Sequence, residues 1–217
     1  MTALAVDLYG RGLAATASGR APHGVYVEYD DGSRVALPLR RWSRPLVAGD
    51  RSLLARVQGP TLDIGCGPGR LVAAVTATGV PALGIDICPE AVRITRSSGA
   101  YALRRDVFGR VPAEGRWQTA LLADGNIGIG GDPVALLRRT RALLAPGGRA
   151  LVELDPPGTR SRQVRVRLRS AAEHSRWFGW AHLGVDDLPV VAEAAALAPE
   201  AVWKGRGRWF ACLVARS

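Results

Sequence analysis

Three glycines at alternate positions, Gly65, Gly67 and Gly69, follow a short apolar run and precede a helical pattern. Glycine has no Cβ and takes a positive φ readily, so such a loop turns sharply and lets a ligand contact the backbone. The unpaired amides at the start of the following helix favour a polar or anionic ligand group. The segment therefore predicts a site for a nucleotide-like ligand.

The spacing around this loop separates two kinds of nucleotide site. The dinucleotide fingerprint G-x-G-x-x-G requires a glycine at position 70, where this chain has Arg70. The observed pattern is D-x-G-x-G-x-G, with Asp63 two positions before the first glycine. This pattern resembles motif I of the class I methyltransferases that depend on S-adenosylmethionine (SAM). The resemblance implies that Asp63 orients the amino group of the cofactor, and that Arg70 either pairs with its carboxylate or is solvated. It also implies that the loop contacts the cofactor at Gly65, Cys66, Gly67 and Gly69.

Two further acidic residues follow the second and third expected strands. Asp86, with Ile87 beside it, lies about 20 residues after the glycine loop, where a carboxylate can accept hydrogen bonds from both ribose hydroxyls. A helix cap is the alternative. By the same resemblance, Asp106 accepts a hydrogen bond from the adenine amino group, and Val107 and Phe108 supply apolar contacts. Pairing of Asp106 with a neighbouring arginine is the alternative there. Acidic residues at three successive strand ends favour SAM over NAD.

Strands and helices alternate from residue 61 to residue 154, which predicts a parallel, doubly wound sheet. Asp50 is expected to cap a short helix before the first strand. Apolar segments on both sides of residues 205–207 indicate a final antiparallel hairpin. The expected fold class is therefore α/β, with a doubly wound, mostly parallel seven-stranded sheet and a C-terminal antiparallel hairpin, as the class I methyltransferase fold has. The parallel strands are expected near residues 61–64, 80–85, 101–103, 119–123 and 149–154, with Pro146 to Gly148 ending the helix before the last of them.

Residues 49–217 are expected to form the methyltransferase domain, and the first 48 residues are expected to form an N-terminal extension with a helix and a hairpin. Residues 1–20 hold a weak helical pattern interrupted by two glycines. This pattern indicates either a flap over the cofactor or a loosely packed terminal helix. Residues 25–38 alternate between apolar and other residues around a polar turn, which predicts an accessory hairpin.

A β-rich insertion is expected after the fifth strand, at about residues 156–184. Residues 163–169 have a period of two, with three arginines on one face, and residues 177–183 could be the return strand. The arginines are Arg165, Arg167 and Arg169. They could bind an anionic acceptor, or they could form a solvated face while the alternate apolar residues pack inward. Trp177 and Trp180 could stack on a planar acceptor.

Four residues are candidates for the catalytic chemistry. Asp124 and Asp155 lie at the tips of the fourth and fifth strands, where they can face an acceptor, and Asp124 is also expected near the methionine part of the cofactor. His174 and His182 lie in the insertion and have no partner recognisable in the sequence. A general base is needed only where the acceptor must lose a proton. The Asn/Asp-Pro-Pro-aromatic tetrad of amino-methyltransferases is absent after the fourth strand, which argues against DNA bases and amides as acceptors.

Composition limits the remaining possibilities. The 217 residues carry a net charge of +10, but Lys204 is the only lysine, so the charge reflects an arginine-rich composition and argues against nucleic acid as a partner. The three cysteines are widely spaced and fit neither a disulfide framework nor a zinc site, so no metal is expected. No membrane-spanning segment and no basic signal-peptide start are recognised, which predicts a cytoplasmic protein.

These features together predict a SAM-dependent methyltransferase that acts on a small-molecule substrate, aromatic or anionic, and releases S-adenosylhomocysteine (SAH). Two alternatives stay open at this point. The acceptor could be RNA or protein, or the chain could bind SAM without catalysis.

Overall fold

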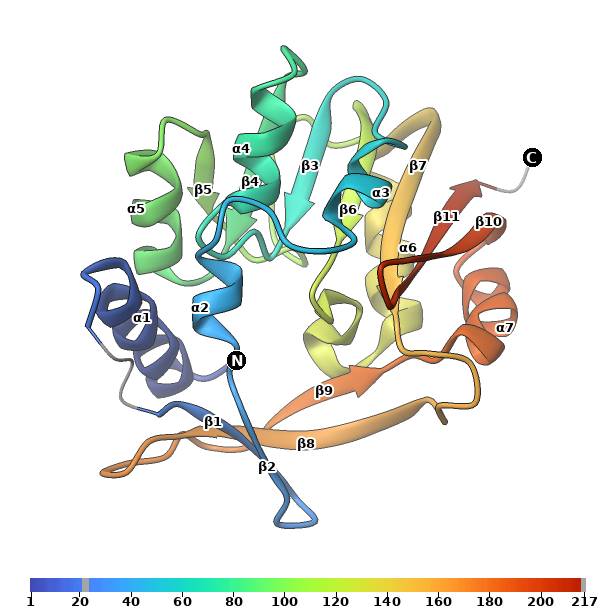
Figure 1. The fold of residues 1–217 in the computed structure, drawn as a ribbon. Coiled ribbons are helices and arrows are strands. Elements are labelled where there is room, and N and C mark those ends of the chain that lie inside the picture. The colour runs from blue at the N-terminus through green and yellow to red at the C-terminus, as the bar shows by residue number, and fades with distance from the viewer. Residues whose placement is uncertain (21–23, 216–217) are drawn as a thin grey trace.

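The computed structural model describes residues 1–20 and 24–215. Its main sheet has seven strands in the order β10-β11-β7-β6-β3-β4-β5 (Figure 1). Five strands pair in parallel, and at one edge β11 pairs antiparallel with both β7 and β10, which confirms the predicted class. The strands are β3 (Thr61–Ile64), β4 (Ala82–Asp86), β5 (Ala102–Arg104), β6 (Trp117–Leu122), β7 (Leu144–Leu154), β10 (Leu197–Gly205) and β11 (Arg208–Ala215).

Helices cover both faces of this sheet, as apolar residues on both sides of the central strands require. On β6, Ala120 packs in the same core as residues of α6 and α7, while the next residue, Leu121, packs in a core with residues of α3 and α4. The helices are α3 (Asp50–Leu54), α4 (Arg70–Thr76), α5 (Pro89–Ser97), α6 (Pro133–Leu143) and α7 (Leu188–Ala194), and the short 3-10 turns are η1 (Asn126–Gly131) and η2 (Val185–Asp187).

A second, four-stranded sheet combines two segments that are far apart in the sequence. Its order is β2-β1-β8-β9, so the N-terminal hairpin pairs with the insertion through β1 and β8. Figure 1 shows this sheet below the carboxyl ends of the parallel strands. The hairpin and the two strands of the insertion were expected from the sequence, but the pairing of the hairpin with the insertion was not. The strands are β1 (Tyr26–Tyr29), β2 (Arg34–Ala36), β8 (Arg162–Arg169) and β9 (Phe178–His182).

The N-terminal segment corrects one expectation. Helix α1 (Ala3–Ala17) is continuous and well packed, because its glycines permit close contacts. A Cβ on Gly12 would lie 2.5 Å from Leu39 Cδ1 of α2 (Leu39–Trp42), and one on Gly10 would lie 3.3 Å from Cys88 Sγ. The expectation of a loosely packed terminal helix is therefore wrong.

Two local boundaries also differ from those expected. Gly49, with a φ of 94°, is the N-cap of α3, and Asp50 is its first residue and is fully buried. The expectation that Asp50 caps this helix is wrong because its carboxylate has charged partners elsewhere in the fold. Strand β7 begins at Leu144, so Pro146 to Gly148 lie within the strand and do not end the preceding helix. Within the described residues, no helix is long and apolar enough to cross a membrane.

Candidate functional site

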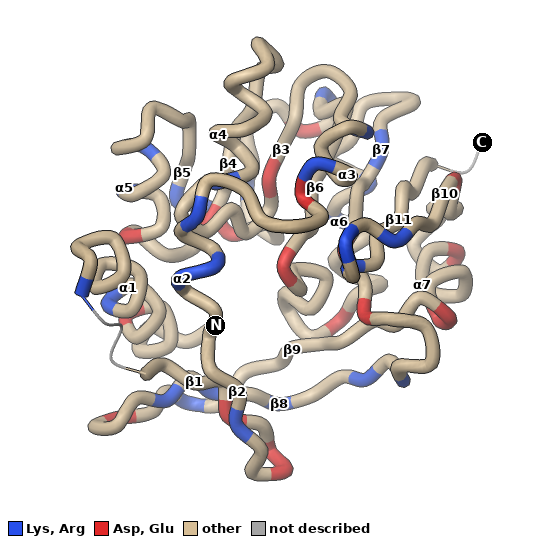
Figure 2. Tube along the Cα trace, in the orientation of Figure 1, with Lys and Arg blue, Asp and Glu red and all other residues tan. Residues whose placement is uncertain are grey.

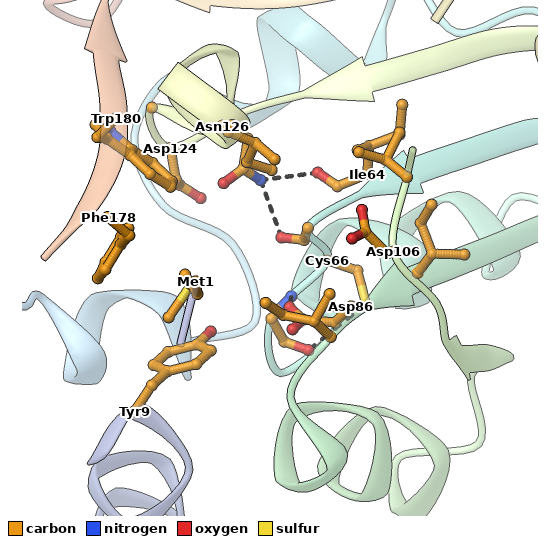
Figure 3. Close-up of a pocket in the computed structure, with 18 of the residues that line it drawn as sticks. Met1, Tyr9, Ile64, Cys66, Asp86, Asp106, Asp124, Asn126, Phe178 and Trp180 are labelled. Carbon is orange, nitrogen blue, oxygen red and sulfur yellow. Dashed lines mark hydrogen bonds between the residues drawn. The ribbon is translucent and has the colours of Figure 1, made fainter. Parts of the chain in front are cut away.

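A cavity of about 360 Å³ lies between the carboxyl edge of the main sheet and the second sheet. This volume is within the range of small-molecule sites, about 300–1,000 Å³. Figure 3 shows its two sides, with the residues of β3, β4 and the loops after them facing side chains of α1 and β9. Ligands of open α/β sheets bind at this edge of the sheet.

The glycine loop is fixed by contacts on both sides. The amides of Gly65 and Cys66 donate to the Ile85 carbonyl at 2.8 and 3.0 Å. All three loop glycines have a positive φ, and a Cβ on Gly69 would lie 2.4 Å from Thr95. Gly65, Cys66 and Gly67 line the cavity, whereas Gly69 lies just beyond it as the N-cap of α4.

Asp86 is held by the backbone of this loop. Its carboxylate accepts hydrogen bonds from the amides of Gly67 (2.9 Å) and Cys88 (2.8 Å) and lines the cavity. Burial raises the pKa of Asp86. Ile87 lies beside it in the cavity wall.

Asp106, Val107 and Phe108 line the cavity on the β5 side. The Asp106 carboxylate accepts from the Phe108 amide at 3.0 Å. Among the described residues, no ion pair joins Asp106 to the neighbouring arginines, which donate to backbone carbonyls. The alternative in which Asp106 pairs with an arginine is therefore not seen.

Asp63 lies behind the loop and not in the cavity wall. Its side chain is buried, and burial raises its pKa to about 7, partly opposed by the charge of Arg70. The nearby carboxylates of Asp124 and Asp86 also raise this pKa.

Arg70 is buried and therefore not solvated, and it lines the cavity. Its guanidinium donates to both carboxylate oxygens of Asp50 at 2.8 and 2.9 Å, and to Asp124 at 2.7 Å. Arg208 joins the same network through Asp50 (2.6 Å) and Glu153 (2.5 Å). The solvated role of Arg70 is therefore corrected, because a buried cation requires carboxylate partners. Its pairing with the cofactor carboxylate stays a prediction.

Asp124 belongs to this network and also lines the cavity. It has a φ of 54°, and its amide donates to Glu153 at 2.5 Å. Burial raises the pKa of Asp124, while the charge of Arg70 opposes that shift. Arg70 and Arg208 each donate to one oxygen of its carboxylate, so both oxygens are already occupied by hydrogen bonds.

Asn126 connects the fourth strand end to the glycine loop. Its Nδ2 donates to the carbonyls of Ile64 and Gly65, each at 2.9 Å (Figure 3). A Cβ on Gly65 would lie 2.7 Å from this nitrogen. The sequence analysis missed Asn126, because its partners are 61 and 62 residues away.

The second sheet presents an apolar face to the cavity. Alternate residues of three strands line it: Val27 and Tyr29 of β1, Val166 and Leu168 of β8, and Phe178, Trp180 and His182 of β9. The arginines of β8 take the other face, where Arg167 and Arg169 pair with Glu28 at 3.0 and 3.4 Å. Figure 2 shows the Lys and Arg positions, in blue, along β8 where it passes the hairpin of β1 and β2. The hydrogen bond from Arg167 lowers the pKa of Glu28 to about 2. Arg165, Arg167 and Arg169 are therefore not among the residues that line the cavity.

The candidates in the insertion divide between the two faces. His182 lines the cavity, with its Nε2 3.2 Å from the Tyr29 hydroxyl and its Nδ1 3.2 Å from Asp155. His174 lies outside the cavity and contacts Arg167 at 3.4 Å. Trp177 also lies outside, beneath the Arg167 guanidinium, whereas Trp180 faces the cavity.

The N-terminal helices supply residues that the sequence analysis did not select. Met1, Tyr9 and Trp42 line the cavity, and the rings of Tyr9 and Trp42 meet edge to face at 6.0 Å. Burial raises the pKa of Tyr9 well above 10. For Tyr9 the available signal was an aromatic residue within residues 1–20, but the helix period alone does not say which face is covered.

The sheet order, the terminal hairpin and the glycine loop at the carboxyl edge define the class I, Rossmann-like methyltransferase fold. One similar structure is a SAM-dependent methyltransferase from Bacteroides fragilis in complex with SAH, with 22% identity, a TM-score of 0.83 and coverage of 98% of this chain and 97% of that one. Another is the 1,6-didemethyltoxoflavin N1-methyltransferase of Burkholderia thailandensis, with 19% identity, a TM-score of 0.57 and coverage of 78% and 79%. The sugar N-methyltransferase KedS8 from Streptoalloteichus is also similar, with 17% identity, a TM-score of 0.56 and coverage of 78% and 85%.

A family model described as "Methyltransferase domain" matches residues 39–187, more than half of the chain. The chain belongs to this methyltransferase family. A search of curated proteins gives no match to the sequence.

Proposed function

We propose that this protein transfers a methyl group from SAM to a small, planar, largely apolar acceptor. The observation that carries the proposal is the cavity itself. Its one side is built from the glycine loop and the acidic strand ends, and its other side is the apolar face of the second sheet. These two sides suit a nucleoside with an amino-acid tail and an apolar acceptor, respectively.

The cofactor would lie against the main sheet. Asp86 would accept hydrogen bonds from the ribose hydroxyls, Asp106 and Val107 would contact the adenine, and the backbone of Gly65 to Gly67 would line the methionine part. The fit rests on open backbone at the loop and on a carboxylate already fixed by two amides. When bound, SAM supplies a methyl group that a sulfonium has already activated. Similar structures from Bacteroides fragilis and Burkholderia thailandensis were solved with SAH.

Asp63 would act on this cofactor from behind the loop. Its side chain does not line the cavity, so it would reach the amino group of the cofactor through a bridging water or after a small movement of the loop. Gly69 would act in the same indirect way, by starting α4 and fixing the loop.

The acceptor would be aromatic and not anionic. Phe178, Trp180, Tyr9 and Trp42 supply aromatic surface, which stacks well on a planar ring. The arginines that could have bound an anion pair with Glu28 on the opposite face of the sheet. The toxoflavin precursor bound to the Burkholderia thailandensis enzyme supports a heteroaromatic acceptor by analogy.

We treat residues 1–48 and 156–184 as one acceptor-binding unit, because β1 and β8 join them in a single sheet over the cavity. Residues 49–155 and 185–217 would form the methyltransferase core. The cytoplasmic location stays a prediction from composition.

Titration calorimetry with SAM and SAH tests the proposal. We expect SAH to bind and to raise the melting temperature, with NADH as the negative control. The absence of both a binding heat and a thermal shift with saturating SAM and SAH would refute it. Conversion of SAM to SAH only when an acceptor is present separates an enzyme from a SAM-binding protein without catalysis.

A further inference from the structure

Three side chains form a chain of hydrogen bonds that leads out of the cavity. The Tyr29 hydroxyl lies 3.2 Å from His182 Nε2, and His182 Nδ1 lies 3.2 Å from Asp155 Oδ2. Tyr29 and His182 line the cavity, and Asp155 lies behind them. Among the described residues that this sheet directs into the cavity, the others are apolar or are the Trp180 indole.

The second sheet fixes this arrangement. His182 lies two and four residues after Trp180 and Phe178 on β9, so all three share the inner face, and β1 brings Tyr29 to the same face. Asp155 is held next to β9 by two backbone hydrogen bonds. Its amide donates to the Leu183 carbonyl at 2.9 Å, and its carbonyl accepts from the Val185 amide at 3.1 Å.

The hydrogen bonds define how protons are shared. A carboxylate at Nδ1 favours the neutral imidazole that carries its proton there, which leaves the Nε2 lone pair for the Tyr29 hydroxyl proton. The Tyr29 oxygen then keeps lone pairs for a donor in the cavity. Burial raises the pKa of Tyr29, the charge of Arg162 opposes this shift, and Asp155 and Asp31 add to it, so the phenol stays neutral.

We propose that Tyr29, His182 and Asp155 form a proton relay, and that the acceptor carries a hydroxyl or a ring N–H that loses its proton during methyl transfer. This inference rests on the proposed function and adds the class of the acceptor atom. Tyr29 and His182 are the catalytic residues, and Asp155 is a positioning residue.

Atoms and charge balance in this step. The O–H or N–H bond of the acceptor breaks, and the proton passes to Tyr29 while the Tyr29 proton passes to His182 Nε2. The acceptor's electron pair forms the bond to the methyl carbon, and the pair of the S–CH3 bond stays on sulfur. The positive charge moves from the sulfonium to the imidazolium, where Asp155 stabilises it until the proton leaves to water.

The other candidate base is less suitable. Asp124 lines the same cavity, but Arg70 binds its carboxylate at 2.7 Å and Arg208 approaches it at 3.4 Å. A carboxylate acceptor, a thioether or a tertiary amine would need no base, and the relay would serve no purpose for it.

Turnover with isotopically labelled methyl-SAM and a small-molecule cell extract tests the relay. We expect the label on an oxygen or a ring nitrogen. We expect His182→Gln to lower kcat by about 10²–10⁴-fold while SAH affinity is kept, because a general base contributes that much. The matched control is His174→Gln, which removes a histidine outside the cavity and should leave kcat unchanged. Tyr29→Phe should lower kcat, and exogenous imidazole should partly restore the activity of His182→Ala.

The outcomes separate the two proposals. A methyl ester, a sulfonium or a C-methyl product, or full activity of His182→Gln, would overturn the relay and leave the methyltransferase proposal intact. Failure of the wild type to bind SAH would overturn both.

A readout without turnover checks the geometry. Nitrogen-15 NMR of the SAH-bound full chain should show His182 protonated at Nδ1, and Asp155→Asn should shift that resonance. Protonation at Nε2 in the neutral ring would contradict the relay, because Tyr29 could not then donate to it.

Discussion

Replacing Asp63 by asparagine is expected to make the ligand-free protein more stable than the wild type at alkaline pH. Asp63 is buried behind the glycine loop, and burial raises its pKa from 3.8 to about 7. Between these two values the folded state holds a proton that the unfolded state has released. The free energy of unfolding of the wild type therefore falls as the pH rises through this window.

The magnitude follows from the two pKa values. Their difference corresponds to about 4 kcal/mol of unfolding free energy, all of which is lost once the pH exceeds about 7. Asparagine is neutral at every pH, so the variant does not lose this contribution. The free energy of unfolding of the variant, relative to that of the wild type, should therefore rise by up to about 4 kcal/mol between acidic and alkaline pH.

Urea unfolding of both proteins at about pH 4 and at about pH 8 measures the effect. Asp30→Asn is the matched control, because Asp30 is exposed and its replacement removes the same formal charge. The reasoning is refuted if Asp63→Asn and the wild type show the same dependence of stability on pH. SAH affinity, measured on the same samples, also tests whether Asp63 acts on the cofactor.

Three further substitutions test other parts of the site. Arg70→Gln removes the shared partner of two buried carboxylates, Asp50 and Asp124, and should lower the free energy of unfolding by about 3–5 kcal/mol in urea. Gly128→Ala would place a methyl carbon 2.3 Å from a backbone oxygen of β9, and should cost about 1–3 kcal/mol, seen as a lower melting temperature. Asp86→Asn leaves one carbonyl acceptor where the carboxylate has two, and should weaken SAH binding about 10- to 100-fold by calorimetry.

The first two of these substitutions each have a control on the same chain. Arg110→Gln removes an exposed arginine and should leave stability nearly unchanged, so an equal loss in both variants would argue against the buried network. At Gly109 an added Cβ would meet only an ordinary contact of 3.4 Å, and a Gly109→Ala protein as unstable as Gly128→Ala would contradict the steric argument. Unchanged SAH affinity in Asp86→Asn would remove Asp86 from the cofactor site.

The sequence predicted which loops meet at the carboxyl edge of the main sheet, and their contacts with the cofactor stay a prediction. Residues 61–70 and the acidic residues Asp86 and Asp106 lie in short segments whose strand-to-loop transitions are visible in local patterns. Parallel strands end at the same edge of their sheet, so the fold class alone predicts that residues at those ends lie close together. The same locality explains why the strands and the return hairpin of the insertion were predicted.

The acceptor side depended on contacts between distant segments. The period of two in β8 predicted that arginines and apolar residues lie on opposite faces of the strand. It did not predict which face lines the cavity. The pairing with β1 decided this, because Glu28 on β1 binds Arg167 on the face away from the cavity. Asp50 was expected to cap a helix, and Arg70 to pair with the cofactor carboxylate or to be solvated. The fold joins both residues to Asp124, 54 residues beyond Arg70, in one network.

The sequence by itself therefore determined the fold class and the cofactor loop, since both are built from local periodicity and glycine spacing. Only the tertiary structure decided which side chains His182, Asp155 and Asp124 contact. Tyr29 and His182 are 153 residues apart, and Asp155 is 27 residues from His182, so no pattern in the chain connects them. Their contact arises because the second sheet brings Tyr29 of β1 beside His182 of β9, and a backbone hydrogen bond to Leu183 holds Asp155 next to β9.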